Sequence, residues 1–272
     1  MRLSNEVYKV ANVMDRKLSK LNYRVAIRLL AVLASAAGLN LAWATSAQAA
    51  GNVEVREEDG ALIITGDDSD NNIIVQEGGL VTGRAGTTIN GNGRFEPFDV
   101  IHDINIKMKG GDDFVRVDAG PGTTVFRDVK IDTGMGDDII EILGLRVRDE
   151  TRIDTGDGDD LLFIDGVLTP FGFSRSDFTG KFTLDSGSGR DLFEFHNATF
   201  RDEVDVRLGF GIDGACGFED SEFQRPHMVR FDGGPPSGGF SGDGIVNAGL
   251  EFTITDFEDF PDDCSFLGGR DI

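Results

Sequence analysis

The stretch from Lys130 to Phe195 contains one sequence motif three times: KIDTGMGDDIIEI (130–142), RIDTGDGDDLLFI (152–164) and TLDSGSGRDLFEF (183–195). In each copy, an apolar residue and an Asp lead into a Gly-rich turn. The turn ends on an Asp, and an apolar, strand-like run follows. Self-similarity of this kind predicts a repeat architecture, so it comes before any other interpretation of the chain.

The last Asp of each turn marks the repeat, at Asp138, Asp160 and Asp191. Weaker copies of the turn extend the series to Asn71, Asp113 and Asp213. Successive markers are 42, 25, 22, 31 and 22 residues apart. A unit of about 22 residues explains these steps if the first is two units, or one unit with a long insert. The 31-residue step then carries about nine extra residues, visible as VLTPFGFSRSDF at 167–178.

The run after each turn alternates apolar and polar residues, which predicts a strand with one buried and one wet face. The residues expected to face the core are Val115, Val117, Ile140, Ile142, Leu162, Ile164, Phe193 and Phe195. The residues expected to face outward are Arg116, Glu141, Phe163 and Glu194. A second strand is expected before each turn, at VKID, TRID, FTLD and VRFD. A third short strand is expected in connectors such as LGLRVRDE and NATFRDEV.

No segment after residue 50 shows a sustained 3.6-residue apolar period, so essentially no helix is expected. Units of this size predict an all-β, right-handed parallel β-helix or β-roll solenoid. The alternative is an antiparallel β-sandwich, which leaves the recurrence of one turn unexplained. Residues 50–244 are expected to form the repeats, with 51–75 as a first coil and 78–97 as a loop or irregular coil. Residues 245–272 are the candidate cap.

The first 49 residues differ from the rest, with seven Lys/Arg against two acidic residues and an apolar segment at 26–44. Together with Ala47-Gln48-Ala49, they predict a cleaved secretory signal peptide, or, alternatively, an uncleaved membrane anchor. The basic leader is long, so Met14 is a second possible start. We expect a secreted or cell-surface protein without a membrane span in its mature chain.

Residues 50–272 carry 19 basic and 46 acidic residues, a net charge of −27 with His neutral. This charge excludes nucleic acid and anionic membranes as natural partners and favours cations, of which a metal ion is the smallest. The only cysteines are Cys216 and Cys264. In an exported chain they are expected to form one disulfide that ties the last clear repeat to the C-terminal tail, with two free buried thiols as the alternative.

The turns TGMGDDIIE, TGDGDDLLF and SGSGRDLFE resemble the nonapeptide GGxGxDxUx of the RTX, or hemolysin-type calcium-binding, family. Positions two, four, six and eight match, whereas Thr133, Thr155 and Ser186 stand where the family has Gly. The resemblance implies Ca2+ held between stacked turns by the sixth-position carboxylates and by turn carbonyls. The implied ligands are Asp113, Asp138, Asp160 and Asp191, joined by their neighbours Asp112, Asp137 and Asp159.

This chain departs from the family in having one such turn per unit instead of tandem nonapeptides, and in its N-terminal leader. Asp-Gly sequences also make good turns without an ion. However, carboxylates stacked about 5 Å apart repel by roughly 3 kcal/mol per pair at an effective dielectric of 20, and Asn would make the same turns without that cost. A second acidic row, Asp132, Asp154, Asp185 and Asp232, precedes the turns. It is expected to hydrogen-bond turn N–H groups, with a share in the same ions from the other side of the turn as the alternative.

These observations predict a secreted calcium-binding repeat protein with a structural or interaction role. Its partner is left open among an extracellular polymer, a surface protein and a second copy. The alternative function is a parallel β-helix enzyme that acts on polysaccharides. Its candidate residues, Arg190, Arg201, His196 and His227, occur in no catalytic motif, and no catalytic residue is assigned.

Overall fold

The computed structural model describes residues 51–120, 125–169, 172–211, 213–216, 221–232, 244–245 and 253–255. Over these ranges the chain is all-β, with strands that pair mainly in parallel, and its only helical pieces are the 3-10 turns η1 (Glu77–Gly79) and η3 (Pro226–Met228). Within this part of the chain, no helix has the length and apolarity of a membrane span. The expected signal peptide, Cys264 and most of the expected cap lie outside the described residues, as do Pro170 and Phe171 of the expected insert.

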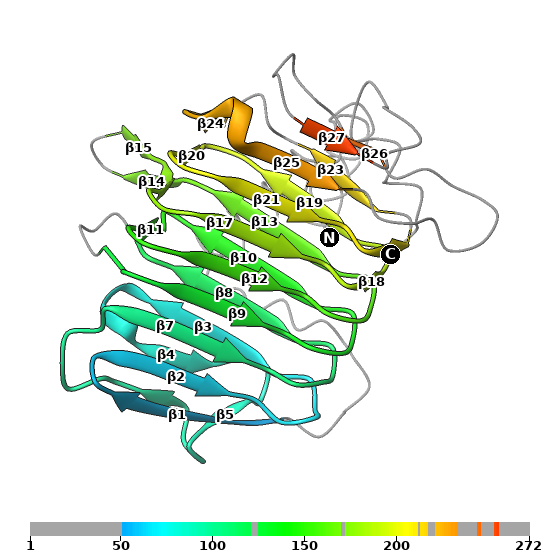
Figure 1. The fold of residues 1–272 in the computed structure, drawn as a ribbon. Coiled ribbons are helices and arrows are strands. Elements are labelled where there is room, and N and C mark those ends of the chain that lie inside the picture. Colours follow the sequence, from blue (N-terminus) through cyan, green and yellow to red (C-terminus); the bar gives the residue numbers. More distant parts are fainter. Residues whose placement is uncertain are drawn as a thin grey trace, which may run out of the picture. The chain divides into compact units, whose positions relative to one another are not determined.

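The largest sheet contains the strands that precede the Gly-rich turns, in the order β27-β25-β21-β17-β12-β9-β7-β2-β1-β5 (Figure 1). Their bounds are β1 Asn52–Glu58, β2 Ala61–Thr65, β5 Thr88–Ile89, β7 Asp103–Lys107, β9 Val129–Asp132, β12 Thr151–Asp154, β17 Phe182–Asp185, β21 Val204–Arg207, β25 Val229–Asp232 and β27 Thr253–Thr255. From β2 to β27 every pairing is parallel, so each repeat adds one strand to the sheet.

The second sheet contains the strands that follow the turns, in the order β26-β23-β19-β13-β10-β8-β3-β4-β6. Their bounds are β3 Asn72–Gln76, β4 Val81–Gly83, β6 Arg94–Phe95, β8 Phe114–Asp118, β10 Ile139–Leu143, β13 Leu161–Asp165, β19 Leu192–Phe195, β23 Gly214–Cys216 and β26 Gly244–Ile245. From β3 to β26 the pairing is again parallel.

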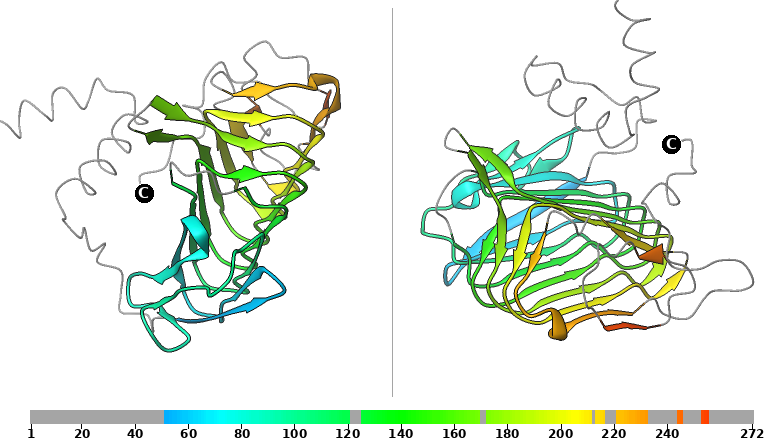
Figure 2. Two further views of the ribbon diagram at one scale, coloured as in Figure 1. Left: turned by 90° about the vertical axis from the view of Figure 1, so that its left-hand side faces the viewer. Right: turned by 90° about the horizontal axis from the view of Figure 1, so that it is seen from above.

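The connectors contribute a third, four-stranded parallel sheet in the order β11-β16-β20-β24, as the LGLRVRDE and NATFRDEV segments predicted. Its bounds are β11 Arg146–Val147, β16 Ser176–Phe178, β20 Ala198–Phe200 and β24 Glu222–Phe223. The chain therefore visits three sheets in rotation, and Figure 2 shows the strands of successive repeats running side by side.

Two irregular steps of the repeat are explained by inserts. β3 pairs directly with β8, so the 42-residue step from Asn71 to Asp113 is one unit with a long insert. That insert is more ordered than expected, because the supposed loop at 78–97 contains part of η1 and the strands β4, β5 and β6. The 31-residue step carries an antiparallel hairpin, β14 (Val167–Thr169) with β15 (Gly172–Ser174). This insert is shorter than the predicted 167–178, because Ser176–Phe178 form β16, which belongs to the third sheet.

The core forms as the alternation predicted. All eight residues expected to face inward are at most 1 % exposed, and the four expected to face outward are partly exposed. The ladder changes in character along the chain, from Val and Ile in the early repeats to Phe in the later ones. The rings of Phe178, Phe200 and Phe223 stack face to face at centroid separations of 5.1 and 4.9 Å.

The N-terminal end departs from the repeat. β1 runs antiparallel to β2, with Val55 opposite Ile64, so residues 51–75 are not the simple first coil that was expected. β4 also runs antiparallel to both β3 and β6. At the other end, β26 and β27 continue the parallel pairing of their sheets.

Candidate metal centre

The sixth-position aspartates form one buried column at the edge where the Gly-rich turns stack. We call Asp113, Asp138, Asp160, Asp191 and Asp213 the inner row; each is at most 2 % exposed. The column is continuous because the residues that follow these aspartates pair in register, as in Ile139 with Leu161. The sequence-predicted alignment of the marker residues is therefore correct.

Each inner-row carboxylate bonds to the turn before it. Oδ1 of Asp160 accepts the backbone N–H of Asp138 at 2.8 Å, and Oδ1 of Asp138 accepts that of Asp113 at 2.7 Å. The pattern starts at Asn71, whose N–H donates to Asp113, and continues to Asp191 and Asp213. Every turn in the column is thus tied to the next by a buried hydrogen bond.

The fifth-position aspartates form a second, more exposed column, the outer row, made of Asp70, Asp112, Asp137 and Asp159. Their hydrogen bonds run in the opposite direction along the stack: Oδ1 of each accepts the N–H at the same position of the following turn. The bonds are Asp112 to Asp70 (3.0 Å), Asp137 to Asp112 (3.0 Å), Asp159 to Asp137 (2.9 Å) and Arg190 to Asp159 (3.0 Å). The Asp-Asp pair therefore links each turn to both of its neighbours.

Glycine is required at the second and fourth positions of these turns because successive turns stack in direct contact. A Cβ on Gly158 would lie 1.9 Å from the carbonyl oxygen of Gly136, and one on Gly156 would lie 1.8 Å from that of Gly134. Both residues also have positive φ, 145° and 98°, which disfavours any residue with a Cβ. The glycines shared with the RTX pattern thus have a structural requirement that holds with or without an ion.

The hydroxyl residues that replace the first Gly of the family pattern form a third buried row. Oγ1 of Thr133 donates to the carbonyl of Thr155 at 2.9 Å, Oγ1 of Thr155 donates to that of Ser186 at 3.2 Å, and Oγ of Ser186 donates to that of Leu208 at 2.6 Å. The same hydroxyls lie close enough to lower the pKa of the inner-row Asp in their own turn. Sequence reasoning treated this position only as a mismatch and missed the row.

Burial nevertheless raises the pKa of the inner-row carboxyls. The pKa rises to about 8 at Asp113 and Asp160, to about 6 at Asp138 and to about 7 at Asp191. Loss of hydration is the largest cause in all four, and the backbone hydrogen bond opposes it only in part. Repulsion from other aspartates adds to the shift. Near neutral pH the row needs either protons or a cation.

The second oxygens of these groups are the feature that fits a metal. Oδ2 of Asp113, Asp138, Asp160 and Asp191 is buried and makes no hydrogen bond, which is costly for an oxygen of a carboxylate. Within the described ranges, no three Asp, Glu, His or Cys side chains converge as a metal cluster would. A cation at this edge would hence combine inner-row Oδ2 atoms with backbone carbonyls of the turns.

Two of the four pre-turn aspartates, Asp132 and Asp154, do not bond as expected. Nζ of Lys107 lies 2.6 Å from Oδ2 of Asp132, and Nη2 of Arg152 lies 3.6 Å from Oδ2 of Asp154. Basic side chains, and not the turn N–H groups, thus contact these two carboxylates. The row is also mixed, because Lys107 stands in register with Asp132 on the outer face of the sheet.

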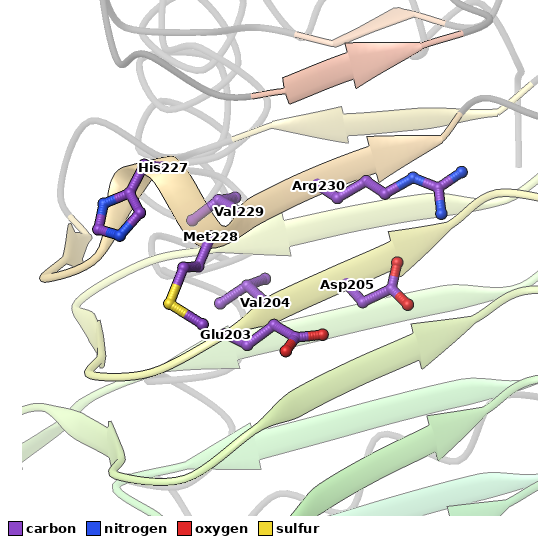
Figure 3. Close-up of a pocket in the computed structure, with 7 residues that line it drawn as sticks. All are labelled: Glu203, Val204, Asp205, His227, Met228, Val229 and Arg230. Atoms are coloured by element: carbon purple, nitrogen blue, oxygen red, sulfur yellow. The ribbon is translucent and has the colours of Figure 1, made fainter.

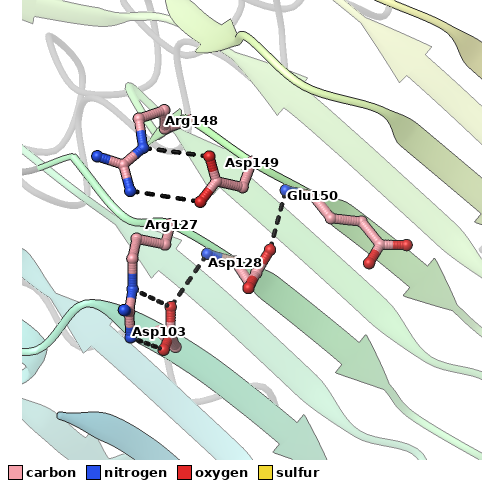
Figure 4. Close-up of polar contacts among 6 residues, drawn as sticks. All are labelled: Asp103, Arg127, Asp128, Arg148, Asp149 and Glu150. Carbon is pink, nitrogen blue, oxygen red and sulfur yellow. Dashed lines mark hydrogen bonds and ion pairs between the residues drawn. The ribbon is translucent and has the colours of Figure 1, made fainter.

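A similar link between repeats occurs at the corner before β9 and β12, where sequence reasoning missed it (Figure 4). Oδ1 of Asp103 accepts the N–H of Asp128 at 3.2 Å, and Oδ1 of Asp128 accepts that of Glu150 at 3.0 Å. The Arg127 guanidinium adds two hydrogen bonds to Asp103. The signal was present in the Arg-Asp pairs that recur at 127–128, 148–149 and 201–202.

A shallow depression of about 320 Å³ lies beside the start of β21 and β25, and Figure 3 shows Glu203 and Asp205 on one strand and Arg230 on its neighbour. Its lining is Glu203, Val204, Asp205, His227, Met228, Val229 and Arg230. The carboxylates are engaged in ion pairs, Glu203 with Lys181 and Asp205 with Arg207, both at 2.7 Å. The depression therefore offers a charged surface whose two carboxylates are both engaged in ion pairs.

The four residues considered for catalysis are dispersed. Arg201 makes two hydrogen bonds to Asp177, His196 lies 3.2 Å from Glu194, and the backbone of Arg190 belongs to the outer row. Only His227 lines the depression. In the part of the chain that the structure describes, these four side chains do not converge on one site.

The chain matches no protein-family model, no curated protein and no solved structure. Its function must be inferred from its own residues.

Proposed function

We propose that this chain is a secreted calcium-binding β-solenoid with a structural or interaction role outside the cytoplasm. The observation that carries the proposal is the inner row: at least four stacked, buried carboxylates, each with one oxygen that makes no hydrogen bond. The solenoid interpretation is supported by the regular addition of one parallel strand per repeat to each of the two large sheets. An antiparallel sandwich does not build sheets in that way.

The residues that would hold calcium are Asp113, Asp138, Asp160 and Asp191, through Oδ2. Calcium suits such a row because it accepts six to eight oxygens in flexible geometry, and carboxylates and turn carbonyls supply them. When bound, the ion supplies positive charge that offsets the repulsion between neighbouring carboxylates. The outer-row residues Asp112, Asp137 and Asp159 would take a lesser part, because they are more exposed and water can solvate their carboxylates.

Protonation is the competing way to neutralise the inner row. With pKa values of about 6 to 8, a part of the row holds protons at pH 7 in the absence of any metal. Calcium and protons therefore compete for the same oxygens. The proposal requires calcium to win at neutral pH and millimolar concentration.

The test is the melting temperature of the full chain in chelator, in about 10 mM calcium and in about 10 mM magnesium. A site with a dissociation constant of about 1 mM would stabilise the fold by roughly 1.4 kcal/mol at that calcium concentration. Calcium is expected to raise the melting temperature clearly. Magnesium is expected to raise it little, because its smaller, octahedral shell fits a row of carbonyls poorly.

Two matched double variants locate the response. Asp138→Asn with Asp160→Asn changes two inner-row residues, and Asp137→Asn with Asp159→Asn changes their sequence neighbours in the outer row. Both replace two carboxyl groups by amides and keep the turn chemistry. The inner pair is expected to lose most of the calcium response, whereas the outer pair retains it. Equal melting temperatures of the unmodified chain in chelator and in calcium would refute the proposal.

A further inference from the structure

The free edge of β1 at the N-terminal end of the largest sheet is closed by a side chain. β5 pairs with β1 only at Asn52 and Val53, and among the described residues no strand lies beside the remainder of β1 on that edge. The backbone N–H and C=O groups of the even-numbered residues of β1 face β2. Those of the odd-numbered residues therefore point toward the free edge. An unprotected edge of this kind can pair with another strand.

Asn90 stands where β5 ends, in a tight two-residue turn. Ile89 and Asn92 exchange backbone hydrogen bonds of 2.6 and 2.8 Å, and the residues between them, Asn90 and Gly91, have φ of 51° and 72°. Positive φ at both central positions is the pattern of a type I′ turn, for which Asn-Gly is the preferred pair. The turn fixes the Asn90 side chain against β1.

The Asn90 amide takes the place of a backbone peptide. Its Oδ1 accepts the N–H of Val55 at 2.9 Å, and its Nδ2 donates to the carbonyl of Val55 at 2.7 Å. Its own backbone N–H donates to the carbonyl of Val53 at 2.9 Å. Further along, the Glu57 carboxylate accepts the N–H groups of Phe98 and Asp99. The Asn90 side chain thus covers the edge at Val55, next to the part of β1 that β5 covers.

We infer that β1 is a latent self-pairing edge, and that Asn90 keeps it closed against a second copy of this chain. Two β1 strands brought together antiparallel about Val55 would exchange backbone hydrogen bonds at Val55, where the Asn90 amide bonds now. The pairing covers residues 54–56, because β5 and the Asn90 N–H hold the same edge at Asn52 and Val53. That register sets Glu54 of each copy opposite Arg56 of the other, and opposite charges at facing positions favour pairing. Both residues are exposed, so the second copy fits the edge in charge as well as in hydrogen bonding.

Asn90→Gly in the full chain tests this inference. Glycine accepts the left-handed φ of 51° without strain, so the turn survives while the amide is removed. Size-exclusion chromatography with light scattering at about 10 and about 500 μM is expected to show a shift toward dimer at the higher concentration. Asn92→Ala is the matched control, because the Asn92 side chain bonds only to the Asn90 carbonyl and does not touch β1. This control is expected to behave as the unmodified chain.

Hydrogen exchange of residues 52–58 reports the surface that is used. In Asn90→Gly the Val55 amide is expected to exchange faster at low concentration and to regain protection at high concentration. Adding Arg56→Glu sets like charges opposite each other and is expected to abolish the dimer. An Asn90→Gly chain that folds but stays at the mass of the unmodified protein would overturn the inference. Association that leaves exchange at 52–58 unchanged, or that survives Arg56→Glu, would also overturn it.

Discussion

Asp137 and Asp138 carry the same side chain in adjacent positions of one turn, yet the structure gives them opposite environments. Asp138 is fully buried, faces the preceding turn and has a pKa raised to about 6. Asp137 is exposed and faces the following turn. Alternation within the turn sends one carboxylate outward and the next inward, so one pair of adjacent residues links each turn to both of its neighbours and also buries one carboxyl group in each turn.

The largest expected effect comes from a substitution that forces neighbouring turns apart, because both rows of aspartates depend on the contact between turns. Gly158→Ala places a methyl group against the Gly136 carbonyl at a φ of 145°. We expect the free energy of unfolding to fall by about 3 kcal/mol or more, from overpacking and backbone strain together. Urea unfolding measures it, with Gly93→Ala as control, since a Cβ there meets no atom within 4 Å. Similar midpoints for the two variants would show that turn contact is not limiting.

The next effect compares the rows directly. At pH 5, Asp138→Ala leaves the buried N–H of Asp113 without its acceptor and is expected to cost about 2 kcal/mol. Asp137→Ala removes the acceptor of the Asp159 N–H. This position is exposed, so water replaces the acceptor, and the expected cost is less than about 1 kcal/mol. Chemical denaturation of both variants measures the difference. Equal costs would mean that burial does not distinguish the rows.

The pH dependence sharpens the same comparison. The inner-row carboxyls have pKa values of about 6 to 8 in the folded chain, against 3.8 as the ordinary value of Asp, so the folded chain binds more protons than the unfolded one between these limits. In chelator, the contribution of these groups to stability is complete below about pH 4 and is lost as pH rises through 6 to 8. Thermal unfolding from pH 4 to 9 is expected to show this fall. Saturating calcium is expected to reduce or reverse it, and a flat profile in chelator would contradict the buried-row electrostatics.

The smallest effect concerns the hydroxyls that stand where the family pattern has Gly. Thr155→Val removes the buried donor to the Ser186 carbonyl and is expected to cost about 1 kcal/mol, and to raise the pKa of Asp160 further. Ser188→Ala removes a hydrogen bond to Asp157 that is exposed, with an expected cost below about 0.5 kcal/mol. Denaturation compares the two, and carboxyl titration by NMR follows Asp160. A larger loss of stability in Ser188→Ala than in Thr155→Val would contradict the assignment of Thr155 to a buried hydrogen bond and of Ser188 to an exposed one.

The sequence alone determined the repeat, its strands and the inward faces, because side-chain period and turn chemistry are local properties. The spacing of Asp138 and Asp160 was enough to place them in one column, and the alternation after each turn was enough to select Ile140 and Leu162 for the core. The calcium interpretation also arose from the sequence, and it stays a prediction.

Only the tertiary structure decided which partner each polar group meets. Whether Asp138 bonds to the turn before it or after it depends on the stagger between repeats, which no local pattern encodes. The same holds for the hydroxyl row that begins at Thr133, and for β1, whose antiparallel pairing with β2 follows from an end that has no repeat before it. Asn90 is the sharpest case: a common turn residue whose amide acquires its role only because β1, 35 residues away in sequence, lies beside it.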